Sequence, residues 1–153
     1  MSTANDKLRD LGYELRRPKP PVATYVPVTR LGNALYVSGQ ISSTAEGPVV
    51  GRLGDTMNVV QGSNAAELAA VNILSQIVYS GGVELDAVKR IVKLLVLVNS
   101  TAEFAEHHLV ANGASNLLVA VLGERGQHAR SAIGVAALPL GAAVEVEAIV
   151  EIA

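Results

Sequence analysis

Arg130 is the first candidate for chemistry in this sequence, because it stands at the start of a run of small and apolar residues. The stretch GQHARSAIGVAALP, residues 126–139, carries Ile133 and Val135 and is typical of a buried strand. Burying a guanidinium is costly unless an anion satisfies it. If the protein supplies that anion, Arg130 is structural, and if a ligand supplies it, Arg130 is a binding group.

Glu145 is the acidic residue that the chain could bring to Arg130. Residues 130–137 and 144–152 are predicted as two strands around a turn at 139–141, a hairpin that would place Arg130 and Glu145 close together without direct register. One interpretation is a buried or interfacial salt bridge. The other is an arginine that grips a ligand carboxylate through two hydrogen bonds, beside a glutamate that orients or activates a water. The pattern alone leaves both open.

Other reaction centres find little support in the residues present. The chain has no cysteine, so disulfides, thiol nucleophiles and thiolate metal sites are excluded. His107 and His108 would point about 100° apart on a helix and His128 lies far along the chain, so we expect no metal site. There is no G-x-S-x-G motif, and GRLGDT lacks the lysine of a phosphate-binding loop.

Length and composition indicate a single domain over residues 1–153, with half of the residues hydrophobic and a core built from aliphatic side chains. A net charge of −2 provides no general field for nucleic acid or for an anionic membrane, so we expect neither as a partner. The polar start MSTANDKLRD has no apolar targeting segment, which makes the cytoplasm the expected location. Residues 1–21, with prolines near their end, are expected to form a solvated N-terminal arm.

The elements that must position Arg130 and Glu145 follow from hydrophobic spacing. A hairpin is predicted over residues 24–41, a helix over 57–80 and a strand over 88–98. Ser100, with Glu103 three residues later, predicts the start of a second helix, which Asn112 and Gly113 would kink. With the two final strands the order is ββαβαββ, an α+β fold with two helices packed on one face of a mixed sheet.

The other face of that sheet leads to a prediction about assembly. Residues 34–41 and 88–98 carry apolar side chains at both odd and even positions, so both faces of these strands are apolar. The face without helices would therefore expose apolar surface. We therefore expect an obligate homo-oligomer.

Two stretches, LGNALYVSGQI at 31–41 and HARSAIGVAALPLGAAVEVEAI at 128–149, resemble the RidA/YjgF family, also called the endoribonuclease L-PSP family. The second keeps the family pattern R-S-x-x-x-V-x-x-L-P followed by V-E-x-E in unbroken spacing. The resemblance implies a chorismate-mutase-like fold and a homotrimer with ligand clefts between subunits. It also implies hydrolysis of 2-imino or enamine acids to 2-keto acids and ammonia, without a cofactor.

The resemblance also implies roles for individual residues. Arg130 corresponds to the carboxylate-binding arginine and Glu145 to the water-orienting glutamate. Tyr25 corresponds to a tyrosine that closes the cleft, and Ser38 and Gly39 to the turn that lines it.

The sequence departs from the family pattern beside the arginine. Ala132 would line the pocket where deaminating members commonly carry cysteine, and Gly134 replaces a glutamate. The longer second helix leaves two counterparts, His108 and Asn112, for the family's helical asparagine. These departures favour either a deaminase with another substrate or a non-catalytic, metabolite-binding trimer, while the acidic balance of the chain weakens a ribonuclease activity.

Overall fold

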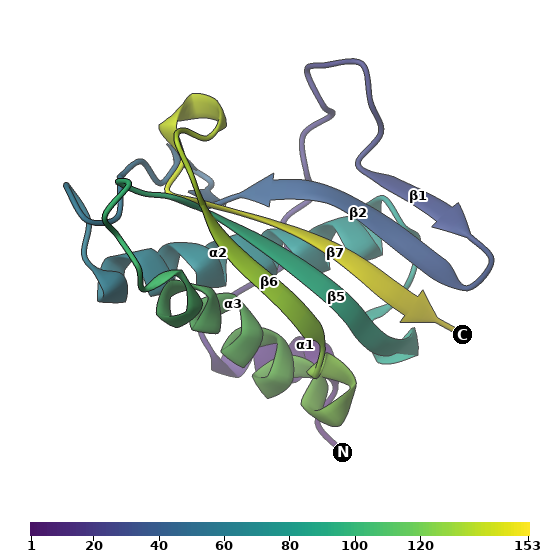
Figure 1. Ribbon diagram of the computed structural model, residues 1–153. Coiled ribbons are helices and arrows are strands. Elements are labelled where there is room, and N and C mark those ends of the chain that lie inside the picture. The colour runs from purple at the N-terminus through teal and green to yellow at the C-terminus, as the bar shows by residue number, and fades with distance from the viewer.

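The computed structural model describes all residues 1–153 and contains one five-stranded sheet with two long helices against it (Figure 1). The order of the main elements after the N-terminal segment is the predicted ββαβαββ, which confirms the α+β class. Sheet order is β1-β2-β7-β5-β6, and a separate small hairpin joins β3 and β4. The helices and strands are α1 (Ala4–Asp10), β1 (Val28–Leu31), β2 (Ala34–Ile41), β3 (Ser43–Thr44), β4 (Gly47–Pro48), α2 (Val59–Tyr79), β5 (Val88–Asn99), α3 (His107–Leu122), β6 (Ala129–Val135) and β7 (Val144–Ile152).

Helix α2 forms as the sequence predicts. Its N-cap Asn58 accepts a hydrogen bond from the backbone of Gln61, and the Gln61 side chain accepts one from the Asn58 backbone, a reciprocal pair that satisfies two free N–H groups. Small and branched residues that recur at helical spacing form its buried side, and Ser80 caps its end before Gly81 and Gly82.

Helix α3 begins later than predicted and is not broken at Gly113. Ser100 does not cap it, because that residue still belongs to the end of the strand region, and the helix starts at His107 without a side-chain cap. The helix continues unbroken across Asn112 and Gly113, from His107 to Leu122. Gly113 instead lets the two helices approach closely, because a Cβ there would collide with the backbone carbonyl of Ser63 on α2.

The predicted hairpin of the last two strands is wrong. Strand β6 pairs in parallel with β5, and β7 lies between β2 and β5 as an antiparallel neighbour of both. The reason is that helix α3 connects β5 to β6 as a crossover, and a crossover helix returns the chain parallel to the strand it left. Strand β6 therefore forms the edge of the sheet, and β5 separates it from β7.

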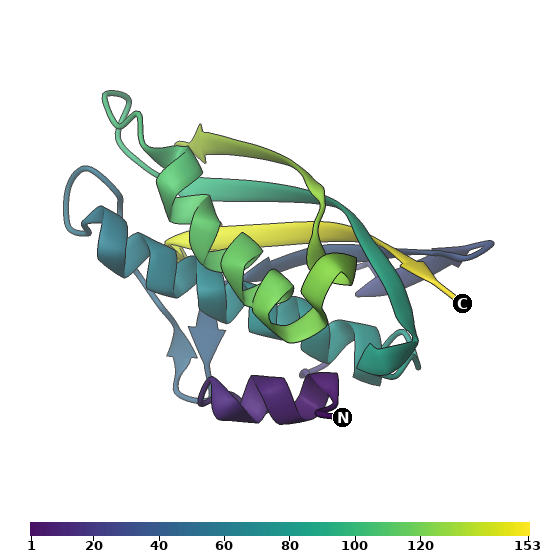
Figure 2. The ribbon, with the colours of Figure 1, turned by 90° about the horizontal axis from the view of Figure 1, so that it is seen from below.

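The two faces of the sheet differ sharply in burial. Both long helices cover one face, as Figure 2 shows, and the other carries no helix. Along β7 the side chains alternate as predicted, with Val144, Val146 and Val150 fully buried and Glu145 and Glu147 on the opposite face. We call these the helix face and the open face.

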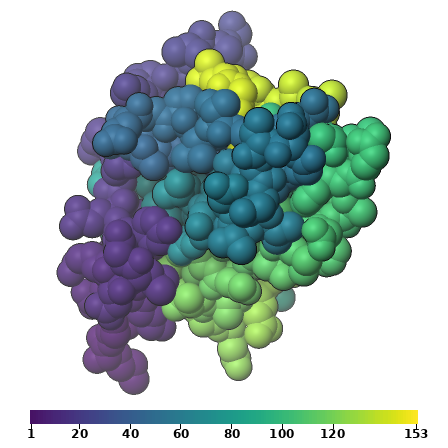
Figure 3. Space-filling model, turned by 90° about the vertical axis from the view of Figure 1, so that its left-hand side faces the viewer, coloured from purple at the N-terminus to yellow at the C-terminus, as the bar shows by residue number.

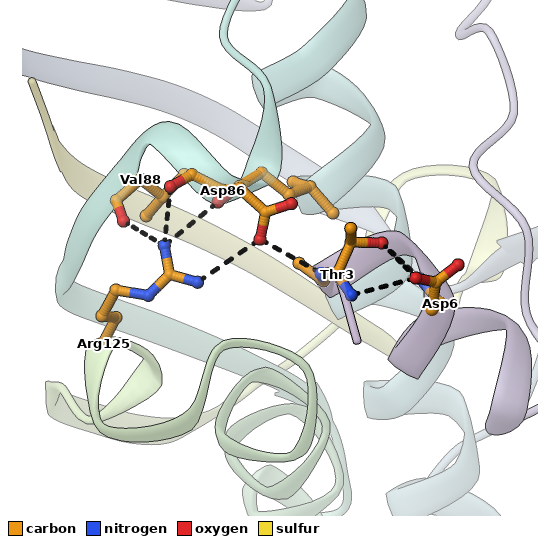
Figure 4. Close-up of polar contacts among 7 residues, drawn as sticks. Thr3, Asp6, Asp86, Val88 and Arg125 are labelled. Atoms are coloured by element: carbon orange, nitrogen blue, oxygen red, sulfur yellow. Dashed lines mark hydrogen bonds and ion pairs between the residues drawn. The ribbon is translucent and has the colours of Figure 1, made fainter. Parts of the chain in front are cut away.

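The N-terminal segment is only in part the solvated arm that its prolines indicate, since residues 16–21 are largely exposed but residues 4–10 are not an arm. Residues 4–10 form helix α1, begun by a reciprocal cap between Thr3 and Asp6, and this helix buries Ala4 and Leu8 in the core. In Figure 3 the segment, in purple, runs along one side of the molecule. Figure 4 shows how it is held: Asp86 accepts a hydrogen bond from the Ala4 N–H at 3.1 Å and lies 3.7 Å from the Arg125 guanidinium. None of the helices is both long and apolar enough to cross a membrane.

Candidate functional site

Arg130 projects from the sheet-edge strand β6 toward helix α3, and its partners are neutral. Nη1 donates to Asn112 Oδ1 at 3.1 Å and to Ser115 Oγ at 3.0 Å, and Nη2 donates to the carbonyl of His108 at 3.2 Å. A guanidinium has five N–H donors, so one on Nε and one on Nη2 have no protein partner. No carboxylate pairs with this half-buried charge. Two free N–H groups are the number that a ligand carboxylate needs for two hydrogen bonds.

His128 extends this contact set behind the arginine. Ser115 Oγ accepts from Arg130, so its own proton is free to go to His128 Nε2, which lies 2.8 Å away. That leaves His128 Nδ1–H as the donor to the carbonyl of Gly126 at 2.6 Å. Burial lowers the pKa of His128, and the nearby charge of Arg130 lowers it further. A neutral imidazole therefore helps to fix the hydroxyl that holds the arginine.

Glu145 lies on the open face of β7 in a half-buried position. Its register partner on β2 is Ile41, and an irregularity of that pairing between Val37 and Gln40 brings Gly39 directly over the carboxylate. A Cβ at Gly39 would lie 2.9 Å from the Glu145 carboxyl carbon, so a side chain there would push the carboxylate out of its present position. Burial raises the pKa of Glu145, and the charge of Glu147 raises it further.

Ser38 joins this region to the loop that carries Tyr25. The hydroxyl of Ser38 donates to the carbonyl of Val26 at 2.9 Å, and its backbone N–H donates to the carbonyl of Pro27 at 2.9 Å. Tyr25 is 51 % exposed and free to contact another molecule. The loop therefore holds an exposed phenol next to the strand segment that covers Glu145.

The structure does not bring Arg130 and Glu145 together within one chain. Arg130 is the register partner of the buried Leu94 on β5, which places the Arg130 side chain on the helix face. Glu145 is level with Leu97 of β5, whose other register partner is the exposed Ile133, which places it on the open face. The prediction that the two charges lie close together is therefore wrong, and Arg130 and Glu145 form no salt bridge within one chain. Both expectations rested on the incorrect hairpin.

The candidate residues therefore form two separate groups. The arginine half-site comprises Arg130, Ala132 and the α3 groups that hold the guanidinium, namely the His108 carbonyl, Asn112 and Ser115. The glutamate half-site comprises Tyr25, Ser38, Gly39 and Glu145.

The arginine half-site includes residues that sequence reasoning did not single out. Of its two candidates on α3, Asn112 touches Arg130 through its side chain, whereas His108 contributes only its backbone carbonyl. Ser115 was missed, although its spacing of three from Asn112 and seven from His108 puts all three on one helix face. That spacing could have identified it.

Comparison with known proteins places the chain in a family. Residues 16–152 match the family described as endoribonuclease L-PSP. Protein TCP17 of Trypanosoma cruzi is 46% identical over 95% of this chain and 91% of its own length. The crystal structure of Atu1372 from Agrobacterium tumefaciens, a protein of unknown function, has a TM-score of 0.91 at 46% identity and covers 99% of this chain and 94% of its own.

A more distant match carries the family's other name. The crystal structure of RidA from an Antarctic Psychrobacter has a TM-score of 0.59 at 30% identity, covering 89% of this chain and 94% of its own. The chain belongs to the endoribonuclease L-PSP family, the group also known as RidA/YjgF.

Proposed function

We propose that this protein binds a small carboxylate between two copies of the chain. The arginine half-site of one copy and the glutamate half-site of its neighbour together would form one cleft, repeated around a homotrimer. The observation that carries the proposal is the half-buried guanidinium of Arg130, which three neutral groups hold in place while two N–H groups remain free.

The open face supports an assembly of this kind. Around Glu145 it presents Leu95, Leu97 and Ile133, and Ile133 is 48 % exposed in the single chain. Covering such side chains is favourable by about 25 cal/mol for each Å² of apolar area removed from water. A neighbouring copy that docked its β6 edge here would bury this surface and bring its Arg130 toward Glu145.

The reaction that fits these groups is hydrolysis of a 2-imino acid. Arg130 would fix the substrate carboxylate, and Glu145 would accept a proton from a water as its oxygen adds to the carbon of the C=N bond. Glu145 would then return the proton to the nitrogen of the addition product. Loss of ammonia from that product leaves the 2-keto acid. Burial raises the pKa of Glu145, which makes its carboxylate a stronger base toward the water. An imine is already electrophilic, so placing the water against its carbon can be enough for hydrolysis. The proposed reaction takes place in the cytoplasm and uses no cofactor.

A second candidate is a binding trimer without catalysis. It is favoured by the two residues that follow Arg130 on the same side of β6, since Ala132 and Gly134 provide no polar side chain for proton transfer. This candidate shares the carboxylate cleft and differs only in the absence of turnover.

Substitution of Arg130 tests the binding proposal. Arg130→Lys keeps the charge but loses the planar fork, so affinity for 2-ketobutanoate, measured by calorimetry, should fall roughly ten-fold or more while the melting temperature changes little. Arg90→Lys is the matched control, because Arg90 forms an exposed pair with Glu151 and should bind like the wild type. Wild-type affinity in Arg130→Lys would contradict the proposal.

Turnover separates the two candidates. Ammonia release should be measured on a 2-imino acid that is generated freshly in the assay, with wild type and Arg130→Lys side by side. Release that depends on Arg130 supports the deaminase. Carboxylate binding without any release supports the non-catalytic trimer.

A further inference from the structure

A serine–histidine pair lies on the same side of the edge strand as Arg130 and has no role in the site described so far. Ser100 Oγ and His107 Nε2 are 3.2 Å apart, at the end of β5 and the start of α3. Ser100 is only 5 % exposed, and the His107 ring meets Phe104 edge-on with centroids 5.1 Å apart. Two separate elements therefore hold the pair in a fixed place.

The edge strand makes room for this pair. A Cβ at Gly134 would lie 2.5 Å from His107 Nε2 and 2.6 Å from Ser100 Oγ, so a side chain at that position would displace both groups. Gly134 is level with the buried Val98 and Arg130 with the buried Leu94, which puts both on the helix face of β6.

One side chain of the edge strand lies between the pair and the arginine. Residues 130 and 134 are four apart on an extended strand, about 13 Å between their Cα atoms. Because side chains alternate, the methyl group of Ala132 is the one side chain of β6 between them on that face. The strip therefore has a cation at one end, a small apolar floor and a polar pair at the other end.

The pair retains one hydrogen-bond donor in either arrangement of its proton. If the Ser100 hydroxyl donates to Nε2, then the Nδ1–H of His107 is left over. If Nε2–H donates to Ser100, the hydroxyl proton is left over. No protein group accepts a hydrogen bond from the remaining donor. A donor of this kind fits a ligand group that accepts a hydrogen bond.

We propose that Ser100 and His107 form a second contact for the ligand of Arg130, one that selects carboxylates with an uncharged hydrogen-bond acceptor, such as an amide, at the far end. This inference rests on the proposed carboxylate cleft and names its substrate class. An uncharged acceptor at the far end of the ligand is favoured over a second carboxylate. Glu103 and Glu106 lie on the segment that leads into His107, and a second carboxylate would meet their like charges there.

Three stable carboxylates test the proposal by calorimetry. Succinamate ends in an amide, 4-methylpentanoate has nearly the same shape with an apolar end, and succinate ends in a second charge. For the wild type we expect succinamate to bind more tightly than succinate. In His107→Phe, the ratio of succinamate affinity to 4-methylpentanoate affinity should fall by roughly five-fold, the effect of one lost hydrogen bond.

Further variants make the result decisive. His107→Leu replaces His107→Phe if the latter does not fold, His107→Gln should preserve the ratio by retaining a donor, and Asn116→Ala on the exposed side of α3 is the control. An unchanged ratio in the apolar variants, or tighter binding of succinate than of succinamate, would overturn the inference. Arg130→Lys should weaken all three probes and keep the ratio. If it weakens none, or if the wild type binds none, the proposed function itself fails.

Discussion

At the scale of single residues, the site is defined by two charges in contrasting surroundings. Arg130 is held by neutral oxygens and keeps donors to spare, whereas Glu145 is half-buried near another carboxylate. Neither arrangement serves the stability of the isolated chain, because the arginine lacks an anion and the glutamate is harder to ionise than in water. Groups kept in such surroundings are candidates for function.

Glu145 should therefore make stability depend on pH. Its pKa is raised in the folded state from an ordinary value of 4.5, so the folded protein holds the proton more tightly than the unfolded chain. This contribution to stability is complete below the ordinary pKa and is lost as the pH rises through the raised value. As long as no cation of a neighbouring copy pairs with Glu145, Glu145→Gln should consequently melt higher than the wild type at pH 7, by roughly 1–3 °C, and the difference should vanish near pH 4.

Thermal melts at the two pH values check this prediction. Glu46→Gln, in the exposed β3–β4 hairpin, is the control and should match the wild type at both. A Glu145→Gln variant that melts lower than the wild type at pH 7 would show that ionised Glu145 has a stabilising partner.

At the scale of elements, sequence patterns predicted what depends on local periodicity. The apolar spacing of α2 and the strict alternation of β7 were read correctly. The start of α3 was wrong because Ser100 and Glu103 imitate a helix cap, while Ser100 in fact pairs with the segment at Leu53. Helix α1 was missed although Thr3 and Asp6 carry the signal for its start.

Strand pairing could not be read from local signals. The turn at 139–141 suits a hairpin, but the crossover through α3 decides that β6 lies parallel to β5. The residues of the site were therefore identified individually, through the resemblance of the strand motifs to a family, while their distribution over two faces needed the three-dimensional pairing. The Ser115–His128 contact likewise joins residues whose meeting depends on how α3 packs beside β6.

The contact between the two long helices depends on Gly113. Gly113→Ala should destabilise the protein by about 1–3 kcal/mol, because the new methyl group would push α3 away from the α2 backbone at Ser63. This is a demanding test, since alanine favours a helix by about 1 kcal/mol relative to glycine. Chemical denaturation measures the change, and Asn116→Ala on the exposed side of α3 should be neutral or slightly stabilising. Equal stability of Gly113→Ala and the wild type would show that the helices have room to adjust.

At the scale of the whole molecule, the main feature is that one chain carries two separate groups of candidate residues, which the proposed function joins between copies. The arginine half-site lies on the helix face at the β6 edge, and the glutamate half-site lies on the open face beside β2. A ring of copies that docks one half-site against the other completes every site at once, because the contact is head-to-tail. Such a ring also covers the apolar side chains of the open face, so assembly and site formation are the same event in this account.

Mixing two inactive variants tests this central claim most directly. Arg130→Ala and Glu145→Gln should each lose imino-acid hydrolysis when assembled alone. If they are unfolded together in equal amounts and refolded as mixed rings, about a quarter of the sites combine an intact Arg130 from one chain with an intact Glu145 from its neighbour. We predict recovery of about a quarter of the wild-type ammonia release. A mixture as inactive as its two components, with mixed rings confirmed by native mass spectrometry, would contradict a site shared between chains.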